Sequence, residues 1–443
     1  MTPEILLEAL RRRLPESTSP PLEAVGIVQA ATKAAGELPA VLVAGDRDVE
    51  DEAALSGALR ALHASLLPGG RLFWAGPATQ SRALRAALPE AGFVIERRDF
   101  DGPAGAEILV ARPDRFVVRG YHEGDENRIL RLFEASFGVC RNRERWAWEY
   151  RDNPYGAHHI SQAFDADGNL VAHYAGYPVL FHRAGTNGDE RLPALQIGDT
   201  MTARDVRHIG RGTTSLLGRT VEHFRARFEG TVTFAYGFNT ATSRRFSRLF
   251  LGAKEVEPVA FARRDVSHPW PGLSVRERLR GRLRVERVTD FDARFDDLFA
   301  RVRGDYSLLV TRDARYLSWR YAACPNGGYA RYGVYRGRLL VGWAIFRLLS
   351  ERLVWGDALF DPTYPQAVGC LLERAAADHA SATTIEGWLP PRPASWGATV
   401  AGLGFEPRPE PDDLSLMAAP GSWDPEEDFR RRLYYTKGDS DLF

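Results

Sequence analysis

The feature that most constrains this fold is an aromatic motif that occurs twice, because a repeated motif predicts a repeated structural unit. The segment RWAWEYRDNP ends at Pro154, and the segment RYLSWRYAACP ends at Pro325. Trp148 matches Trp319, and the Tyr and Pro that follow them keep the same spacing. At helical spacing, these residues and Trp146 predict core packing rather than a substrate cage.

Each motif is followed by a hairpin pattern and, later, by a Leu-Gly turn. The stretches QAFDADGNLVAHYAGYPV and YGVYRGRLLVGWAIFRL carry Gly168 and Gly337 at their turns. The segments LFLGAKEVEP and VAGLGFEPRP then close the two copies. This matched order predicts two copies of one α/β unit, which we place at residues 115–265 and 284–443, the second with the C-terminal tail.

Residues 1–114 alternate between strand and helix patterns, which predicts an α/β layer. Arg112-Pro-Asp114 is the expected boundary of this first domain. Strands are expected at 40–44, 72–75, 93–97 and 107–111, helices at 52–67 and 81–88, and a turn at 68–71.

The segments LLPGGRLFWAGP, ALPEAGFVIERRDF and EILVARPD of this domain resemble the second half of a class I methyltransferase fold. In that family a helix ending in a Pro-Gly-Gly turn enters the fifth strand, so the resemblance implies a partial Rossmann-like domain. No GxGxG follows a strand near the start, and without it the backbone cannot approach a methyl donor closely. We therefore expect a non-catalytic remnant used for packing or docking.

The balance of positive and negative residues limits the kinds of partner that this chain is expected to bind. Lys+Arg and Asp+Glu each number 58, so the formal net charge is zero. No basic excess points to nucleic acid or to an anionic membrane. The start, MTPEILLEALRRRLPES, has no apolar signal core, and no run reaches the roughly 20 apolar residues of a membrane helix. A cytoplasmic protein with neither nucleic-acid nor membrane partner is expected.

The cysteine and histidine patterns predict no metal site. Cys140, Cys324 and Cys370 form no CxxC pair, which argues against a disulfide framework or structural zinc. Each is expected to be a small buried apolar residue. The histidines show no HExxH spacing, so no metal ligand is assigned.

The segment Arg207-His-Ile-Gly-Arg-Gly-Thr213 lies between a strand expected at 195–203 and a helix expected at 214–228. Its two glycines allow consecutive backbone N–H groups to point into one concavity at the positive end of the helix. Such a concavity binds a pyrophosphate without a base or a metal.

This segment resembles the acetyl-CoA motif of the GNAT superfamily, Arg/Gln-x-x-Gly-x-Gly/Ala. The following TVTFAYGFNTATSRRFSRLFLGAKEV resembles the family's fifth strand and fourth helix. The resemblance implies an α/β chain with two GNAT-like mixed-sheet units in tandem, and acetyl-CoA or another acyl-CoA as co-substrate. The cofactor-binding residues it implies are Met201, Thr202, Arg207, His208, Ile209, Gly210, Arg211, Gly212, Thr213 and Asn239.

The second copy departs from this motif. Its strand LVWGDALFDP is followed by TYPQAVGCLLERAAADHA, where Pro365 and Gln366 replace the glycine-containing concavity. The resemblance implies that this degenerate unit packs beside the first and helps to shape an acceptor pocket.

Attack of an amine on a thioester requires a group that takes a proton and one that offers a proton to the thiolate. Asp199, on the strand beside the cofactor, is the predicted base, directly or through a water that Gln196 orients. A turn or capping carboxylate is its open alternative. Tyr236 is the predicted acid, with a structural phenol as the alternative. The family's usual acid, a Tyr in the next helix, has no counterpart here, and Ser243 is a substitute.

The sequence thus predicts an N-acyltransferase that transfers an acyl group from acyl-CoA to the amine of a small molecule. Acetyl is the favoured acyl group. An aminoacyl-tRNA-dependent transferase of tandem GNAT fold and a non-catalytic scaffold built from degenerate domains are the alternatives. Asp439 and Asp441, near the C-terminus, predict a solvated tail, although the aromatic residues before them predict an end packed against a domain. The oligomeric state is left open.

Overall fold

The computed structural model describes residues 38–44, 52–101, 106–185, 188–270, 283–325 and 327–443. The prediction that the chain has no signal segment concerns residues 1–37, and these lie outside the described residues. The described chain is α/β with three sheets. It forms two compact units: residues 1–141, 159–175 and 199–229, and residues 142–158, 176–198 and 230–443. Among the described helices, none is long and apolar enough to cross a membrane.

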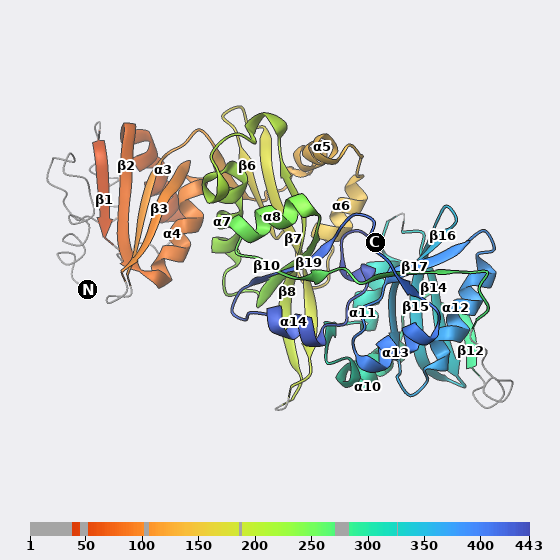
Figure 1. Cartoon of the computed structure of the whole chain (residues 1–443). Coiled ribbons are helices and arrows are strands. Elements are labelled where there is room, and N and C mark those ends of the chain that lie inside the picture. The colour runs from red at the N-terminus through yellow and green to blue at the C-terminus, as the bar shows by residue number, and fades with distance from the viewer. Residues whose placement is uncertain (1–37, 45–51, 102–105, 186–187, 271–282, 326) are drawn as a thin grey trace. The chain divides into compact units, whose positions relative to one another are not determined.

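The N-terminal sheet belongs to the first unit and has the strand order β1-β2-β4-β3. β1 and β2 are parallel, whereas β4 is antiparallel to both of its neighbours. Helices α3 and α4 contact each other beside this sheet (Figure 1). The bounds are β1 (Leu38–Ala44), α3 (Glu52–Ser65), β2 (Leu66–Pro77), α4 (Ala78–Glu90), β3 (Phe93–Asp101) and β4 (Ala106–Pro113).

The turn predicted at 68–71 is wrong, because these residues lie inside strand β2. Leu38 pairs with Leu66, whereas Ala40 pairs with Arg71, so the strands change register between these pairs. The Pro-Gly-Gly sequence is accommodated as an irregularity in a continuing strand, a position where Gly and Pro are tolerated.

The second sheet has the order β10-β19-β9-β8-β7-β6-β5, and β13 also pairs with β7. β8 and β9 are parallel. The strands are β5 (Val117–Gly120), β6 (Ile160–Phe164), β7 (Leu170–Arg183), β8 (Glu190–Thr202), β9 (Phe234–Asn239), β10 (Lys254–Pro258), β13 (Leu308–Val310) and β19 (Ser415–Pro420). The helices are α5 (Glu126–Phe137), α6 (Arg143–Tyr150), α7 (Leu216–Phe228) and α8 (Ala241–Phe250).

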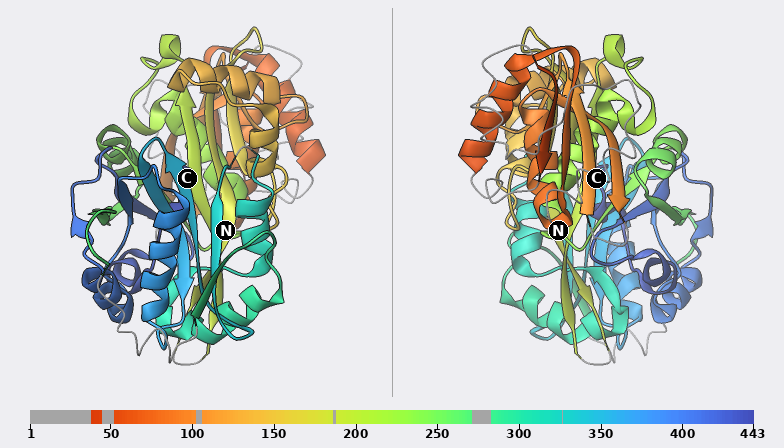
Figure 2. Two further views of the ribbon diagram at one scale, coloured as in Figure 1. Left: turned by 90° about the vertical axis from the view of Figure 1, so that its right-hand side faces the viewer. Right: turned by 90° about the vertical axis from the view of Figure 1, so that its left-hand side faces the viewer.

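The third sheet has the order β12-β14-β15-β16-β17-β11-β18, and β16 and β17 are parallel. Helix α12 contacts β12, β14, β15 and β16 (Figure 2). The strands are β11 (Phe261–Asp265), β12 (Leu283–Arg287), β14 (Ala330–Arg336), β15 (Leu339–Leu349), β16 (Arg352–Phe360), β17 (Thr384–Trp388) and β18 (Glu406–Pro407). The helices are α10 (Ala293–Tyr306), α11 (Ala314–Leu317), α12 (Gln366–Asp378) and α13 (Ala394–Gly402), whereas α14 (Glu426–Arg432) contacts β10 and β13 of the second sheet.

The two large sheets exchange strands. β11, from the predicted first copy, pairs with β17 and β18 of the third sheet. β19, from the predicted second copy, lies between β9 and β10 of the second sheet. The predicted boundary between residues 265 and 284 therefore does not separate the two sheets, because each sheet contains a strand from the other side of this boundary.

The two copies of the aromatic motif meet at one stacked pair of indoles. The rings of Trp148 and Trp319 lie 5.0 Å apart at 17°. Trp148 Nε1 donates to the carbonyl of Trp319 at 2.7 Å, and Trp319 Nε1 donates to the carbonyl of Trp148 at 2.9 Å. Both side chains and that of Trp146 are buried, so the prediction of core packing is confirmed.

Candidate functional site

The predicted pyrophosphate loop joins β8 to α7 in the first compact unit. It contains two short 3₁₀ turns, Arg204–Val206 and Gly212–Thr214. Helix α7 begins at Leu216, later than the start predicted at 214, because Ser215 is its N-cap. The Ser215 hydroxyl accepts from the backbone N–H of Gly218 at 3.0 Å, as N-cap serines do.

The backbone of this loop requires its two glycines. Gly210 has φ +69° and Gly212 has φ +58°, on either side of Arg211 at φ −141°. A Cβ on Gly210 would lie 2.2 Å from the carbonyl oxygen of Thr214. Glycine suits both positive-φ positions because it has no Cβ, and the extended Arg211 lies between them.

The loop is held in place by its own hydrogen bonds. Thr214 Oγ1 donates to the carbonyl of Arg211 at 2.8 Å and accepts from its N–H at 3.2 Å. Arg207 Nε donates to the carbonyl of Thr202 at 3.1 Å. Ile209 packs on a small core that includes Val206, while the side chains of His208, Arg211 and Thr213 are exposed. A preorganised loop with exposed side chains can receive a ligand without refolding.

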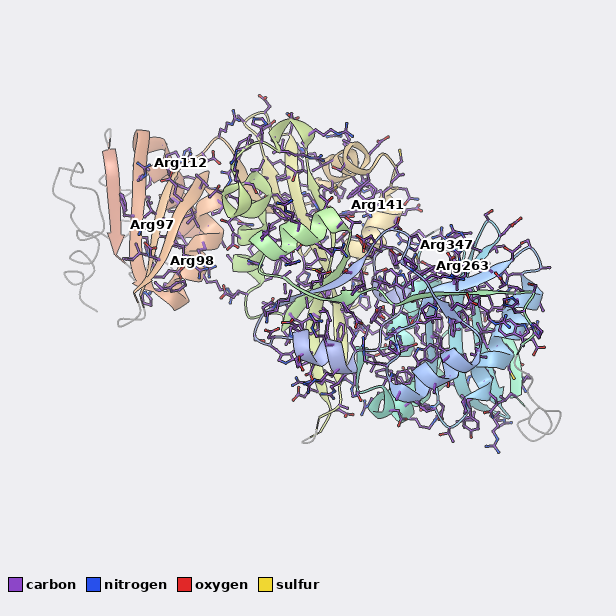
Figure 3. The ribbon with its side chains drawn as sticks, in the orientation of Figure 1. Arg97, Arg98, Arg112, Arg141, Arg263 and Arg347 are labelled. Atoms are coloured by element: carbon purple, nitrogen blue, oxygen red, sulfur yellow. The ribbon has the colours of Figure 1, made fainter. Side chains whose placement is uncertain are left out.

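Asp199, the predicted base, lies at the end of β8 in the same unit. It is buried, with φ +49°. Arg141 (Figure 3) binds both of its carboxylate oxygens, one of them from Nη2 at 3.0 Å. A bidentate guanidinium positions a carboxylate strongly, because two parallel charge-assisted hydrogen bonds fix its orientation. Next to Asp199 on β8, Met201 is buried and Thr202 is half-buried.

His173 fixes the backbone at this point. Its Nδ1 lies 2.8 Å from the carbonyl oxygen of Asp199. A carbonyl can only accept, so Nδ1 carries the proton and donates. Burial lowers the pKa of His173, and the nearby Asp199 opposes this shift without reversing it. The imidazole is therefore neutral, and it holds the Asp199 backbone rather than pairing with the carboxylate.

A similar arginine–aspartate pair occurs in the predicted second copy. Gly198-Asp199 in β8 corresponds to Gly356-Asp357 in β16, and Arg312 binds Asp357 through Nε at 3.0 Å. Arg312 precedes Trp319 by the same number of residues as Arg141 precedes Trp148. The predicted second copy has this pair although it lacks the glycine loop, so the pair occurs independently of that loop.

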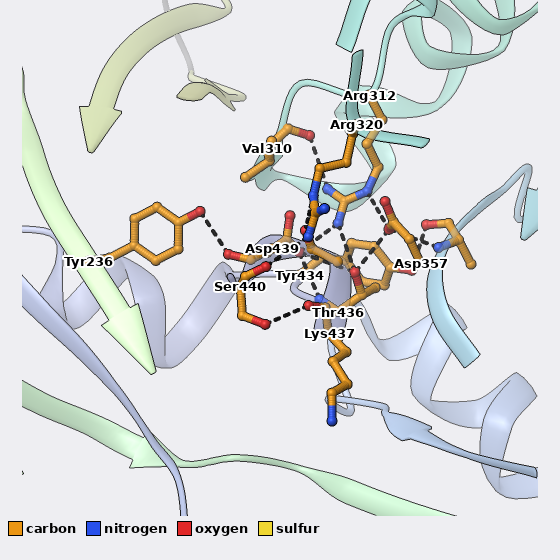
Figure 4. Close-up of polar contacts among 12 residues, drawn as sticks. Tyr236, Val310, Arg312, Arg320, Asp357, Tyr434, Thr436, Lys437, Asp439 and Ser440 are labelled. Atoms are coloured by element: carbon orange, nitrogen blue, oxygen red, sulfur yellow. Dashed lines mark hydrogen bonds and ion pairs between the residues drawn. The ribbon is translucent and has the colours of Figure 1, made fainter. Parts of the chain in front are cut away.

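Arg312 and Asp357 belong to a larger buried network of polar side chains in the second compact unit (Figure 4). Arg312 Nη2 donates to Asp439 at 2.6 Å, and the side chains of Arg312, Asp357 and Asp439 are almost fully buried. Burial lowers the pKa of Arg312, but the two carboxylates outweigh it and hold that pKa well above its usual range. The solvated tail predicted at Asp439 is wrong, whereas the packed end predicted from its aromatic residues is confirmed.

We expect Arg312→Met to destabilise this unit by about 3–5 kcal/mol, because it leaves two buried carboxylates without their cation. The measurement is the thermal unfolding midpoint and the urea midpoint of the purified chain. Arg431→Met is the matched control, since the Arg431–Glu427 pair is mostly exposed and such pairs contribute about 1 kcal/mol or less. Equal midpoints for the two variants would show that the network does not stabilise the fold.

Tyr236, the predicted acid, lies in the second compact unit. Its hydroxyl donates to the carbonyl of Asp439 at 3.0 Å, and burial raises its pKa well above the usual range. This favours the structural alternative for the phenol. Asn239 donates from Nδ2 to Ser247 of α8 at 2.9 Å, while Ser243 is exposed on that helix. The roles of these residues remain predictions.

One carboxylate in the second unit was missed by the functional prediction. Gln196 of β8 donates from Nε2 to Asp441 at 3.2 Å. A Cβ on Gly198 would lie 3.1 Å from Asp441 and 3.3 Å from the Tyr150 hydroxyl. A carboxylate and a phenol thus meet at the strand position directly before Asp199. No local pattern signals this contact, because Asp441 lies 245 residues from Gln196.

Cysteine placement corrects one prediction. None of the three cysteines forms a disulfide; Cys324 is buried and Cys370 is half-buried, but Cys140 is exposed, so the prediction for Cys140 is wrong. Among the residues that the structure describes, no group of three or more His, Cys, Asp or Glu side chains could hold a metal ion.

Comparison with known proteins identifies the middle of the chain. Residues 117–247 match the family described as Acetyltransferase (GNAT) domain. The sequence matches no curated protein. The chain therefore carries a GNAT-type acyltransferase domain, and the resemblance seen in the sequence is confirmed for these residues.

Three solved structures illustrate the similarity of fold. A probable N-acyltransferase from Enterococcus faecalis V583 is 13% identical, covers 69% of this chain and 72% of its own, and has a TM-score of 0.50. A GCN5-related N-acetyltransferase from Kribbella flavida is 16% identical, with coverages of 68% and 70% and a TM-score of 0.50. One from Anabaena variabilis ATCC 29413 is 13% identical, with coverages of 69% and 72% and a TM-score of 0.51. At these identities the similarity is one of fold.

Proposed function

We propose that this chain, whose residues 117–247 form a GNAT-type acyltransferase domain, transfers an acyl group from acyl-CoA to the amine of a small molecule. Acetyl is the first acyl group to test. The observation that supports the proposal is the loop Arg207–Thr213, which has glycine at two positive-φ positions and leads into the start of α7, where backbone N–H groups favour anions. The zero formal net charge supports a small-molecule acceptor rather than a nucleic acid.

In this proposal, β8 runs beside the thioester. The Arg141–Asp199 pair positions the strand, because a similar pair occurs in the predicted second copy, which lacks the glycine loop. Asp441, bound by Gln196, takes the proton of the attacking amine. Tyr236 stays protonated, and no separate acid is assigned, since a thiolate is a good leaving group.

The flanking parts have supporting roles in this proposal. The second copy is a degenerate GNAT-like unit, which the stacked indoles and the repeated arginine–aspartate pair support. The N-terminal domain is a methyltransferase-like remnant without methyl-donor binding, which the missing GxGxG in the sequence supports.

The proposal predicts thiol release when the purified chain is mixed with acetyl-CoA and a panel of small primary amines. Calorimetric titration should give one acyl-CoA site per chain, because only the first copy has the glycine loop. Two equivalent sites would contradict the assignment of the site. No acyl-CoA binding and no thiol release with any amine would favour the non-catalytic scaffold. Transfer only from aminoacyl-tRNA would favour the aminoacyl-tRNA-dependent transferase.

A further inference from the structure

Residues 438–443, called here segment 438–443, pack against one glycine in each of the strands β8 and β16, all within the second compact unit. A Cβ on Gly356 of β16 would overlap the ring of Phe443. A Cβ on Gly198 of β8 would lie 3.1 Å from Asp441 Oδ2. Glycine at both positions therefore allows the segment to approach the two strands closely.

The exposure of the side chains changes sharply along this segment. Ser440 is fully buried and Phe443 is 4% exposed, whereas Leu442 is 48% exposed. Asp441 is half-buried, and its Oδ1 accepts from Gln196 Nε2 at 3.2 Å. The Asp441 carboxylate thus lies against β8 between two buried residues of the segment, while part of this residue stays in contact with solvent.

One buried guanidinium group holds the segment on both sides of Asp441. Arg320 is 1% exposed, and it is labelled together with Ser440 in Figure 4. Its Nη2 donates to the main-chain oxygens of Ser440 at 2.8 Å and Phe443 at 2.9 Å, and its Nε donates to that of Gly438 at 3.3 Å. A guanidinium presents its donors in a rigid fork, so three bonds to one group restrict the path of the segment.

These bonds distinguish Arg320 from the other buried arginine of the network. Arg312 pairs with the carboxylates of Asp357 and Asp439. Arg320 pairs with no side-chain carboxylate among the residues that the structure describes, and its three hydrogen bonds all go to main-chain oxygens. Bonds to main-chain oxygens determine where a segment lies, whichever side chains it carries. The contacts of Arg320 therefore determine where the Asp441 side chain begins.

We propose that Arg320 is a positioning residue for acyl transfer, because it holds segment 438–443 so that the Asp441 carboxylate lies beside Gln196 and Gly198 of β8. This step rests on the proposed function, in which Asp441 takes the proton of the amine. A base must lie within hydrogen-bond reach of the proton that it takes. A displacement of about 1 Å can lower a rate about 10²-fold. Arg320 acts through the segment and exchanges no proton itself.

The first experiment measures the accessibility of Asp441 in the full chain. Carbodiimide-driven coupling of glycine ethyl ester modifies accessible carboxylates, and mass spectrometry locates the modified residue. Arg320→Met should raise the rate of modification of Asp441 at least about tenfold, because the loss of one charge-assisted hydrogen bond already shifts an equilibrium by about this factor. Asp439, which Arg312 binds in the same peptide, is the internal reference and should stay protected.

Arg264→Met is the matched control for this variant. Arg264 is also buried in the second compact unit, at 3% exposed. It too donates to main-chain oxygens, those of Leu403, His268 and Pro269, and these lie outside segment 438–443. The control therefore removes a buried guanidinium of the same kind. It should leave the modification of Asp441 and the turnover of the folded protein unchanged.

Kinetics then test whether Arg320 acts through Asp441. With acetyl-CoA and an amine that gives thiol release, Arg320→Met should lower turnover about 10²-fold at unchanged acetyl-CoA affinity. In an Asp441→Asn background the same change should cause no further loss, because the base that it displaces is already absent. Losses that multiply in the double variant would show that Arg320 acts independently of Asp441 and would overturn the positioning role.

If Arg320→Met fails to fold, Arg320→Lys takes its place, since it keeps the charge but not the fork and must also expose Asp441. Wild-type modification of Asp441 in a folded Arg320 variant would contradict the proposal. If the wild-type chain acylates no amine, the proposed function fails. Modification of Asp441 that rises in the Arg320 variant but not in Arg264→Met would still support Arg320 as the residue that positions this carboxylate.

Discussion

Gly210→Asp is expected to weaken acyl-CoA binding by about 10²–10⁴-fold. The new Cβ would lie 2.2 Å from the Thr214 carbonyl oxygen, at a backbone φ of +69° that suits glycine, so the loop must change shape. A rearranged loop loses two or more hydrogen bonds to pyrophosphate, each contributing about 1.5–3 kcal/mol when one partner is charged. The added carboxylate also repels the anion. Calorimetric titration with acetyl-CoA measures the effect.

Gly168→Asp provides the matched control for this variant. Gly168 has φ +77° in the β6–β7 turn, and a Cβ there meets nothing within 4 Å. The control therefore introduces the same charge at a comparable backbone conformation, far along the chain from the loop. It should leave acyl-CoA affinity unchanged. Wild-type affinity in Gly210→Asp would remove Arg207–Thr213 as the pyrophosphate site.

Asp441→Asn is expected to lower turnover by about 10²–10⁴-fold, the usual contribution of a general base. The substitution keeps the shape of the side chain and removes its ability to accept the amine proton. Gln196 can still hydrogen-bond to the amide oxygen, so acyl-CoA affinity and melting temperature should stay nearly unchanged. Steady-state kinetics, titration and thermal unfolding on the same preparation separate these effects.

Comparison with Asp199→Asn shows which of the two carboxylates acts as the base. Because Arg141 binds both Asp199 oxygens, the change should lower the melting temperature and cost turnover only severalfold. A large loss of turnover at normal stability would return the role of base to Asp199, as the sequence first predicted. Full turnover in Asp441→Asn would remove Asp441 from the mechanism.

Local sequence signals predicted the parts of the site that local geometry determines. The glycines of the loop and the apolar faces of the neighbouring helices are short-range patterns, and the structure places them as a strand–loop–helix unit. Trp148 and Trp319 were also predicted as core residues, because their helical spacing is visible in the sequence. The start of α7 was misplaced because Ser215 captures the first turn as an N-cap.

The remaining features depend on contacts between distant segments. Arg141 binds a carboxylate 58 residues away, and nothing near either residue indicates the partner. The burial of Asp439 was missed for the same reason, because a charged C-terminal residue suggests exposure unless its buried arginine is known. The exchange of β11 and β19 was missed because sheet order is set by tertiary packing, whereas strand patterns indicate only the presence of strands.

The placement of β19 between β9 and β10 has a consequence for the folding of this protein during its synthesis on the ribosome. The acyltransferase sheet lacks this inner strand until residues 415–420 have been synthesised and released, although β5–β9 emerge much earlier. During that interval β9 presents an open edge, the kind of surface that recruits strands from other chains. A gene fragment ending near residue 265 would make this state permanent. Expression of the acyltransferase half alone should therefore yield aggregates, whereas co-expression with the C-terminal half restores the missing strand.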